Sequence, residues 1–404
     1  MKICIISKYP PIQGGVSSAA YWLAKGLGEE GDKVFVISNC WEAEPEYREL
    51  MKNEDMELLE PKNVQLFSTT NEFRSPILKS RYFTSRIASI AIDAIRKYDI
   101  DLIYSHYLLP YGISAMIAKQ ATGKPLVVQH AGSDITRLFS YPSLKSIFLE
   151  VFSNADRIIA YSKTKTHLGE SMEYARKFVN PGFGIDLKAF NPDAEKLDLS
   201  EYTNKEYNNK TIFSYFGKIS GMKKTNEFID ALSVIRDENF LALFVIGNNP
   251  MVENLKKKIV LAGLEEKCVF LPFLPPWKIP KVMNLSTCVV CPESEETPYL
   301  PKGTHGPKIA REAMACGKCA IIGKGVHEKG YYQITKDSEN IIVVDPEKKH
   351  EFAGKLKWVI DNPREVLRIG KNAREFAMKN ENFEAYINNM HKIFFSLKEN
   401  PNQI

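Results

Sequence analysis

The sequence has no apolar run of the roughly 18 residues that a membrane-spanning helix needs. Its first residues, MKICIIS, are too short for the core of a signal peptide and lack a small-residue cleavage site. The charge excess is small, with 54 lysines and arginines against 49 aspartates and glutamates, and this gives little support to nucleic-acid binding. We therefore expect a cytoplasmic protein without a nucleic-acid partner. Anionic small molecules and a membrane surface stay open as ligands.

The composition also lacks the bias of collagen-like, low-complexity or disordered chains. Hydrophobic residues make up 44% of the sequence and charged residues 25%, as in an ordinary globular protein. A length of 404 residues is too great for one core, because domains of about 150 residues are usual. Two domains are the natural expectation.

Cysteine is scarce, and its pattern raises the question of a metal site. The 7 cysteines are an odd number, which fits a reducing compartment. Four of them form Cys288-x-x-Cys291 and Cys316-x-x-Cys319, close to a zinc-ribbon spacing. The first pair lies in TCVVCP, an apolar run typical of a buried strand, in which positions three apart face opposite sides. We therefore favour buried thiols over structural zinc and expect no metal.

The first forty residues follow the pattern of a β-α-β unit. Residues 2–7 and 34–38 predict buried strands, and residues 17–30 between them predict a helix preceded by a Pro/Gly loop. Nearly continuous hydrophobic strands are typical of a parallel sheet with helices on both faces. Further strands are expected at 101–105, 125–130 and 157–162.

A second series of alternating elements begins after a polar stretch. Residues 193–210 are the best linker candidate in the chain because they are polar and poor in strand formers. Beyond them strands are expected at 211–216, 241–247, 269–271, 288–291 and 320–323. We predict an α/β protein of two doubly wound parallel-sheet domains, 1–192 and 211–379. A ligand should bind in the crevice between them, at the carboxyl ends of the strands.

The motif GKISGMKK, residues 217–224, directly follows the first expected strand of the second domain. Gly217 allows a tight turn, and Lys218 and Lys223 lie in the loop that follows. Two ammonium groups at a strand-to-helix loop can neutralise a pyrophosphate, which the adjacent helix N-terminus also favours. The alternative is a solvated basic loop.

The motif GPKIAREAMACGK, residues 306–318, predicts an apolar-faced helix. It begins at a proline, which suits a first helical position, and ends at Gly317. The open amides of its first turn can bind an anion. Glu312 can accept hydrogen bonds from two vicinal hydroxyls such as those of a ribose, although a mid-helix glutamate is more often a surface residue.

Paired glycines, Gly14 and Gly15, precede the first helix and allow a phosphate or sugar to approach the backbone. This loop is neither a GxGxxG dinucleotide motif nor a Walker A loop, so both of those readings lose support.

These motifs, in this order, resemble the retaining glycosyltransferases of family four, which have the GT-B fold. The opening PPIQGGVSSAAYWLAKGLGEEGDKVFVIS is similar to the family's first β-α-β unit. The resemblance continues through HAGSD (130–134), GIDLKAFNP (184–192), GKISGMK, LFVIGN (243–248) and REAMACGK (311–318). It covers nearly the whole chain.

The resemblance implies two Rossmann-like domains that face each other across a cleft. The first domain would be completed by residues from about 380 to 404, because the tail with Phe383 is similar to the family's helix that crosses back. It also implies transfer of a sugar from a nucleoside diphosphate to a hydroxyl acceptor, in glycan or glycolipid biosynthesis. Neither a metal nor a cofactor is required, and a UDP-sugar is the expected donor.

The resemblance also assigns roles to individual residues. Lys218 and Lys223 would stabilise the departing diphosphate, and His130 would lie near the reacting centre, so these three are the implied catalytic residues. The implied donor-binding residues are Gly14, Gly15, Asp134, Gly217, Gly247, Thr304, Gly306, Lys308, Ile309, Ala310 and Glu312.

The sequence departs from the family pattern at the first glutamate of the Glu-x7-Glu motif. That position is Thr304, which is no carboxylate, and Glu295 or Glu296 in the preceding loop could replace it. A catalytically impaired binding partner or scaffold of the same fold is therefore the alternative function. Turnover abolished by substitution of Glu312 or Lys223 would distinguish the two.

Residues 73–98 mix basic and aromatic side chains, among them Arg74, Arg81 and Arg86. Such a stretch could contact an anionic membrane at the inner face of the cell membrane, which suits a lipid-linked acceptor. We favour the simpler interpretation, a sheet-covering helix with a basic outer face. A saccharide acceptor stays equally open.

Overall fold

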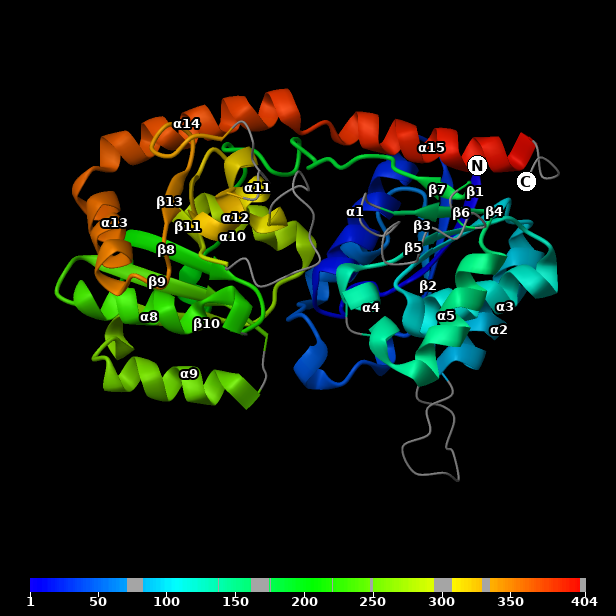
Figure 1. The fold of residues 1–404 in the computed structure, drawn as a ribbon, viewed down its shortest axis with the longest axis horizontal. Helices are drawn as coiled ribbons and strands as arrows, with labels where there is room; N and C mark the ends of the chain where they lie inside the picture. Colours follow the sequence, from blue (N-terminus) through cyan, green and yellow to red (C-terminus); the bar gives the residue numbers. More distant parts are fainter. Residues whose placement is uncertain are drawn as a thin grey trace. The chain divides into compact units, whose positions relative to one another are not determined.

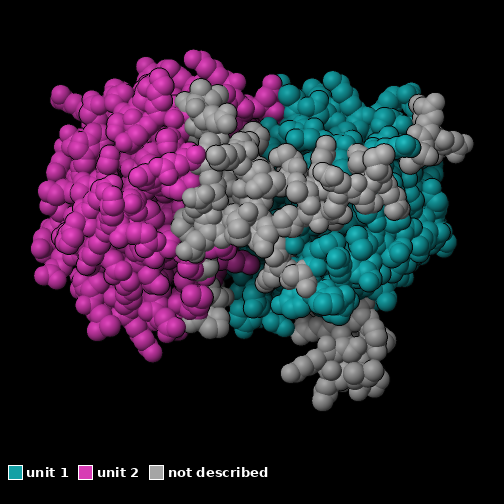
Figure 2. Space-filling view, in the orientation of Figure 1, with its two compact units in different colours: residues 1–183, 384–404 teal, residues 184–383 magenta. Residues whose placement is uncertain are grey.

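The computed structural model describes residues 1–70, 83–136, 138–160, 174, 176–219, 221–247, 250–293, 307–328 and 335–399 (Figure 1). Contacts within the chain divide it into two compact units. Unit 1 comprises Met1–Phe183 and Glu384–Ile404, and unit 2 comprises Gly184–Phe383 (Figure 2). Each unit is an α/β layer structure around its own sheet, as the sequence predicts.

The sheet of unit 1 has seven strands in the order β3-β2-β1-β4-β5-β6-β7. All its strand pairs are parallel, and Cys4 of β1 lies between Phe35 and Ile103 on its two neighbours. The central strands are buried along their whole length because helices cover both faces. The strands are β1 (Lys2–Ser7), β2 (Lys33–Ser38), β3 (Val64–Ser68), β4 (Leu102–His106), β5 (Leu126–Gln129), β6 (Arg157–Ile159) and β7 (Phe178–Val179).

The chain returns to unit 1 at its end, through the helix α15 (Phe383–Glu399). Its Phe394 ring packs against Tyr104 with ring centroids 5.9 Å apart, and Asn389 donates a hydrogen bond to the Pro181 carbonyl oxygen. The return of the tail to the first domain agrees with the expectation from the sequence. The other α-helices among the described residues of this unit are α1 (Gly15–Glu29), α2 (Phe83–Tyr98), α3 (Ile113–Thr122), α4 (Gly132–Thr136) and α5 (Pro142–Asn154).

The sheet of unit 2 has six parallel strands in the order β10-β9-β8-β11-β12-β13. The strands are β8 (Thr211–Phe216), β9 (Phe240–Val245), β10 (Cys268–Leu271), β11 (Cys288–Cys291), β12 (Cys319–Gly323) and β13 (Ile342–Val344). The α-helices in the described part of this unit are α8 (Thr225–Val234), α9 (Pro250–Leu261), α10 (Ile279–Leu285), α11 (Lys308–Ala315), α12 (Lys324–Glu328), α13 (Lys349–Asp361) and α14 (Pro363–Asn380).

All seven cysteines are free and buried, which agrees with the expectation of buried thiols. Cys288 and Cys291 lie on the inner strand β11, where Cys288 is the register partner of Cys319. Within the described ranges, no group of three or more His, Cys, Asp or Glu residues could hold a metal ion. None of the helices in those ranges has the length and apolar character of a membrane span.

The division of the chain differs from the expected boundaries. The first crossing lies between Phe183 and Gly184 rather than at 192, and the second lies after Phe383 rather than at 379. The stretch 193–210, expected as a linker, belongs to unit 2. Its backbone is bonded there, since Leu197 N donates to Lys281 O and Asn284 Nδ2 donates to Ala194 O.

Helix α14 lies unusually close to the end of α11. Gly317 follows α11 with φ +67°, and Lys318 N donates to Ala313 O, which closes the helix end. A Cβ atom placed on Gly370 of α14 would lie 2.3 Å from Gly317 O. Only glycine allows this contact, which positions the helix that carries Glu312.

Replacement of Gly370 should therefore destabilise unit 2. We expect Gly370→Ala to lower the free energy of unfolding by about 1–3 kcal/mol, because the helices must separate. Gly354 in α13 is the matched control, since an added Cβ there meets no atom within 4 Å. Gly354→Ala should raise the free energy of unfolding by about 0.5–1 kcal/mol. Denaturant titration of both variants measures this, and equal effects would contradict the packing argument.

Candidate functional site

The lysine loop of unit 2, residues 217–224, follows strand β8 as expected. Gly217 has φ +129°, a conformation that favours glycine, and Lys218 after it is exposed. The buried Tyr215 supports this loop. Its hydroxyl donates to Lys218 O at 3.3 Å and lies 2.8 Å from Thr225 Oγ1 at the start of α8.

Lys223 has a partner that the sequence did not reveal. Its ammonium group pairs with the Glu293 carboxylate, which follows strand β11. The two side chains are 34% and 24% exposed, so the pair is only partly open to solvent. A Cβ on Gly323, at the end of β12, would lie 2.2 Å from Glu293 O. The ends of β11 and β12 therefore fix the backbone of Glu293.

Glu312 is a buried carboxylate on α11, with a side chain only 4% exposed. Burial raises its pKa, while the Lys308 ammonium group at 3.2 Å acts in the opposite direction. The surface position that a mid-helix glutamate usually takes is therefore not found here. A desolvated carboxylate of this kind can accept hydrogen bonds from ligand hydroxyls strongly.

The Cys291 thiol at the end of β11 shows which charged groups gather there. Burial raises its pKa, Glu293 and Glu312 raise it further, and Lys223 lowers it. Lys223, Glu293 and Glu312 are therefore charged groups that act on this thiol, and Lys223 and Glu293 pair with each other directly after β11. Lys218 lies in the loop after β8 and is exposed, and within the part of the chain that the structure describes it forms no ion pair.

Helix α11 begins at Lys308, as the Pro307 position predicts. Ile309 and Ala310 lie in its first turn, but the Ala310 amide donates to Pro307 O at 3.0 Å and is already bonded. Gly247 is buried just after β9. Thr304, Gly306, Glu295 and Glu296 lie outside the described residues.

A buried ion pair fixes α11 to the chain between α14 and α15. Arg311 Nε donates to Glu381 Oε1 at 2.6 Å, and its Nη2 donates to Glu381 Oε2. Both side chains are less than a tenth exposed. Such a two-pronged pair restricts rotation of the helix that carries Glu312. The sequence offers no local signal for a contact between residues so far apart.

The paired glycines of unit 1 lie between β1 and α1. Gly14 has φ +122°, and an added Cβ at Gly14 or Gly15 meets no atom within 4 Å. The backbone here is therefore open on that side. The loop itself is held from behind, since Gln13 N donates to Tyr47 O and Glu49 N donates to Pro11 O.

His130 and Asp134 lie beyond strand β5. Burial lowers the pKa of His130 to about 4, and its Nδ1 lies 3.1 Å from Ala131 O. Asp134 is fully buried and accepts hydrogen bonds from Ala131 N at 2.8 Å and Leu108 N at 3.3 Å. Asp134 thus supports the loop after His130.

A second histidine, His106, lies at the end of the adjacent strand β4. Burial lowers its pKa to about 3, and the charges of His130 and Lys8 lower it as well. Both imidazoles are therefore neutral near pH 7. Nothing near His106 in the chain distinguishes it from a core residue, so the sequence alone does not predict its place next to His130.

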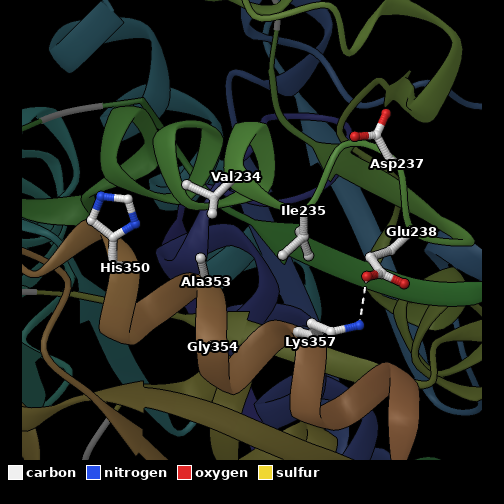
Figure 3. Close-up of a pocket in the computed structure, with 8 residues that line it drawn as sticks. All are labelled: Val234, Ile235, Asp237, Glu238, His350, Ala353, Gly354 and Lys357. Carbon is white, nitrogen blue, oxygen red and sulfur yellow. Dashed lines mark hydrogen bonds and ion pairs between the residues drawn. The ribbon is translucent and has the colours of Figure 1, made fainter.

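A groove elsewhere in unit 2 contains none of the expected site residues. It is formed by the end of α8 and by α13, and Lys357 pairs with Glu238 across one side of it (Figure 3). It lies at the opposite end of α8 from the lysine loop. Its lining residues are Val234, Ile235, Asp237, Glu238, His350, Ala353, Gly354 and Lys357.

The buried histidines should make the protein less stable in acid. The pKa of His130 is lower in the folded protein than in the unfolded chain, where it is about 6.5, so only the unfolded chain takes up the proton at pH 5.5. Unfolding free energy should fall between pH 7 and pH 5.5, by about 1 kcal/mol for each buried histidine. His130→Gln should remove that share, whereas His350→Gln at an exposed position of α13 should not. Denaturant titrations at both pH values compare the slopes, and an unchanged slope in His130→Gln would contradict burial.

Two family models match the chain. The model described as Glycosyltransferase Family 4 matches residues 13–167, and the model described as Glycosyl transferases group 1 matches residues 200–376. Together they span most of both units.

Curated relatives extend over most of the chain. N-acetyl-alpha-D-glucosaminyl L-malate synthase of Bacillus anthracis is 20% identical over 77% of this chain and 78% of that protein. GDP-mannose-dependent alpha-(1-6)-phosphatidylinositol monomannoside mannosyltransferase of Mycolicibacterium smegmatis is 20% identical over 94% of each.

Solved structures share the fold. Sucrose-phosphate synthase from Thermosynechococcus elongatus has a TM-score of 0.68 at 17% identity, over 98% of both chains. Anabaena HepE in complex with UDP and glucose has a TM-score of 0.68 at 18% identity, over 98% of this chain and 99% of that chain. This likeness confirms the GT-B fold that the sequence predicts. From the two matching family models, the chain belongs to the group 1 glycosyltransferases.

Proposed function

We propose that this glycosyltransferase moves a sugar from a nucleoside diphosphate to an acceptor hydroxyl and retains the anomeric configuration. The observation that carries the proposal is the Lys223–Glu293 pair at the end of β11, with the buried Glu312 acting on the same Cys291 thiol. Lys218 lies exposed in the loop after β8. A cation for the diphosphate and a carboxylate for the ribose are the groups that a nucleoside diphosphate requires.

The proposed chemistry follows from the charges that develop during transfer. The bond between the anomeric carbon and the phosphate oxygen breaks, and its electron pair remains on the diphosphate. Lys218 and Lys223 stabilise that growing negative charge more strongly in the transition state than in the ground state. The exposure of Lys218 leaves it accessible to this ligand. No metal is required for this neutralisation.

Retention is proposed through attack on the face from which the diphosphate departs. The acceptor oxygen forms the new bond to the anomeric carbon, and its proton passes to an oxygen of the departing phosphate. His130 is neutral near pH 7 and so can exchange hydrogen bonds with sugar hydroxyls without adding charge. Asp134 holds the loop after His130 in place by accepting a hydrogen bond from the Ala131 amide.

UDP is the proposed nucleotide of the donor. The similar proteins differ in the nucleotide that their descriptions name. HepE is described in complex with UDP and glucose, whereas the mycobacterial relative is described as GDP-mannose-dependent. That relative acts on a phosphatidylinositol monomannoside, which supports a saccharide or lipid-linked acceptor here. Membrane contact through 73–98 remains a proposal. Arg86 of that stretch pairs with Glu42 at 2.7 Å, while Arg74 and Arg81 lie outside the described residues.

The alternative, a catalytically impaired binding partner, rests on Thr304 at the position of the family's first glutamate. It predicts that a nucleotide sugar binds but that no product forms with any acceptor. Active transfer by the wild-type protein would exclude it.

Removal of the Lys223 charge should reduce both binding and turnover. We expect Lys223→Met to lower kcat by about 10²–10³-fold, because one cation is lost from the transition state. UDP should bind roughly tenfold more weakly. Calorimetry with UDP and consumption of UDP-sugars with an acceptor mixture measure the two effects.

Glu312→Gln should weaken UDP binding without affecting the affinity for inorganic pyrophosphate, because Glu312 is proposed to hold the ribose. Lys257→Met, at an exposed position of α9, is the control for both variants and should behave as the wild type. Equal turnover in wild type and Lys223→Met would overturn the assignment of that lysine.

A further inference from the structure

The Lys223–Glu293 pair puts a carboxylate on the lysine proposed to hold the donor diphosphate. Glu293 is held there by the fold, because its carbonyl oxygen lies against Gly323 at the end of the adjacent strand. The backbone of Glu293 is therefore fixed at a place from which its carboxylate reaches Lys223.

The described lysines near Lys223 in the chain differ from it in their partners. Lys218 is exposed and forms no ion pair within the described ranges. Lys224, next to Lys223, is buried and pairs with Glu347 at 2.6 Å and Glu227 at 3.7 Å. Lys224 also lies at the N-terminal end of α8, where its carbonyl accepts from Phe228 N. Glu227 and Glu347 therefore neutralise Lys224, whereas Glu293 pairs with Lys223.

A carboxylate and a phosphoryl group are both anions that bind an ammonium group through oxygen. A diphosphate that reaches Lys223 brings like charges close to Glu293. Two unit charges at 4 Å repel by about 4 kcal/mol at the effective dielectric constant of a protein surface, before rearrangement relieves it. The Glu293 side chain must therefore move away from Lys223 when the diphosphate binds, or it lowers the affinity of the site for the diphosphate.

We propose that Glu293 is a competing anion that occupies Lys223 until the diphosphate displaces it. This inference rests on the proposed function. Displacement favours ligands with two phosphoryl groups, because a monophosphate offers less charge to replace the carboxylate. Return of Glu293 to Lys223 after transfer also weakens the hold on the nucleoside diphosphate product. Glu293 is thus an affinity-determining residue of the donor site and does not touch the reacting atoms.

The test compares nucleotide binding by wild type, Glu293→Gln and the matched control Glu347→Gln. Glu347→Gln removes the same charge from the neighbouring lysine pair. Calorimetry with UDP, GDP, ADP and TDP identifies the nucleoside diphosphate that the wild type binds. For that ligand, Glu293→Gln should lower Kd about two- to fivefold, the range expected from loss of a partly exposed ion pair. Glu347→Gln should leave Kd unchanged. For Glu293→Gln, the matching monophosphate should gain at least as much affinity as the diphosphate, because the competing carboxylate no longer selects against it.

A second variant separates competition from indirect effects. In a Lys223→Met background, Glu293→Gln should produce no gain in affinity, because the contested ammonium group is absent. An unchanged or higher Kd in Glu293→Gln, with wild-type thermal stability, would overturn the inference and leave the proposed function intact. Failure of wild type and variants alike to bind any of the four diphosphates would overturn the proposed function, and the inference with it.

Discussion

The positive charge of Lys223 at the carboxyl edge of a parallel sheet is the interaction on which the rest of the site depends. Parallel strands end at one edge, so loops distant in sequence deliver their polar groups to the same place. Here β8 leads to the lysine loop and β11 leads to Glu293, while α11 contributes Glu312. Charges of both signs gathered on a partly desolvated edge interact more strongly than they would in water. That concentration suits the edge to a ligand with separated charge and hydroxyl groups.

The frame behind this edge is built from contacts that leave little freedom. Gly317 and Gly370 bring α11 and α14 together at backbone distance, and Arg311 joins α11 to Glu381 through two hydrogen bonds. Glu312, adjacent to Arg311, therefore takes its position from a helix fixed at its end and along one side. Unit 1 uses a different device, a buried Asp134 that accepts backbone amides around the loop after β5. In both units a buried charge is satisfied internally and orders a loop or helix next to a candidate ligand group.

Local sequence patterns predict ten of the strands and the loops that carry Gly14, Gly217 and Lys223, whereas β3, β7 and β13 are not predicted. Hydrophobic runs and glycine positions depend on near neighbours, so they can be read one segment at a time. The contacts of Glu293 and Glu381 depend on residues 70 positions away and have no local signature. The polar stretch 193–210 predicts a linker through its hydrophilic composition. Its backbone nevertheless bonds within unit 2, as Leu197 shows, and backbone bonding is nearly independent of side-chain polarity.

The chain crosses between the units twice, and the crossings lie against each other. A Cβ on Gly184, just after the first crossing, would lie 2.6 Å from Phe383 N, just before the second. Unit 2 is thus an insertion with both of its ends at one point. A chimera with a related enzyme should exchange Gly184–Phe383 as a single cassette, since a swap at one junction alone would assign α15 to the wrong parent. Gly184 and Phe383 both lie in that segment, so both sides of their contact would come from the same parent protein.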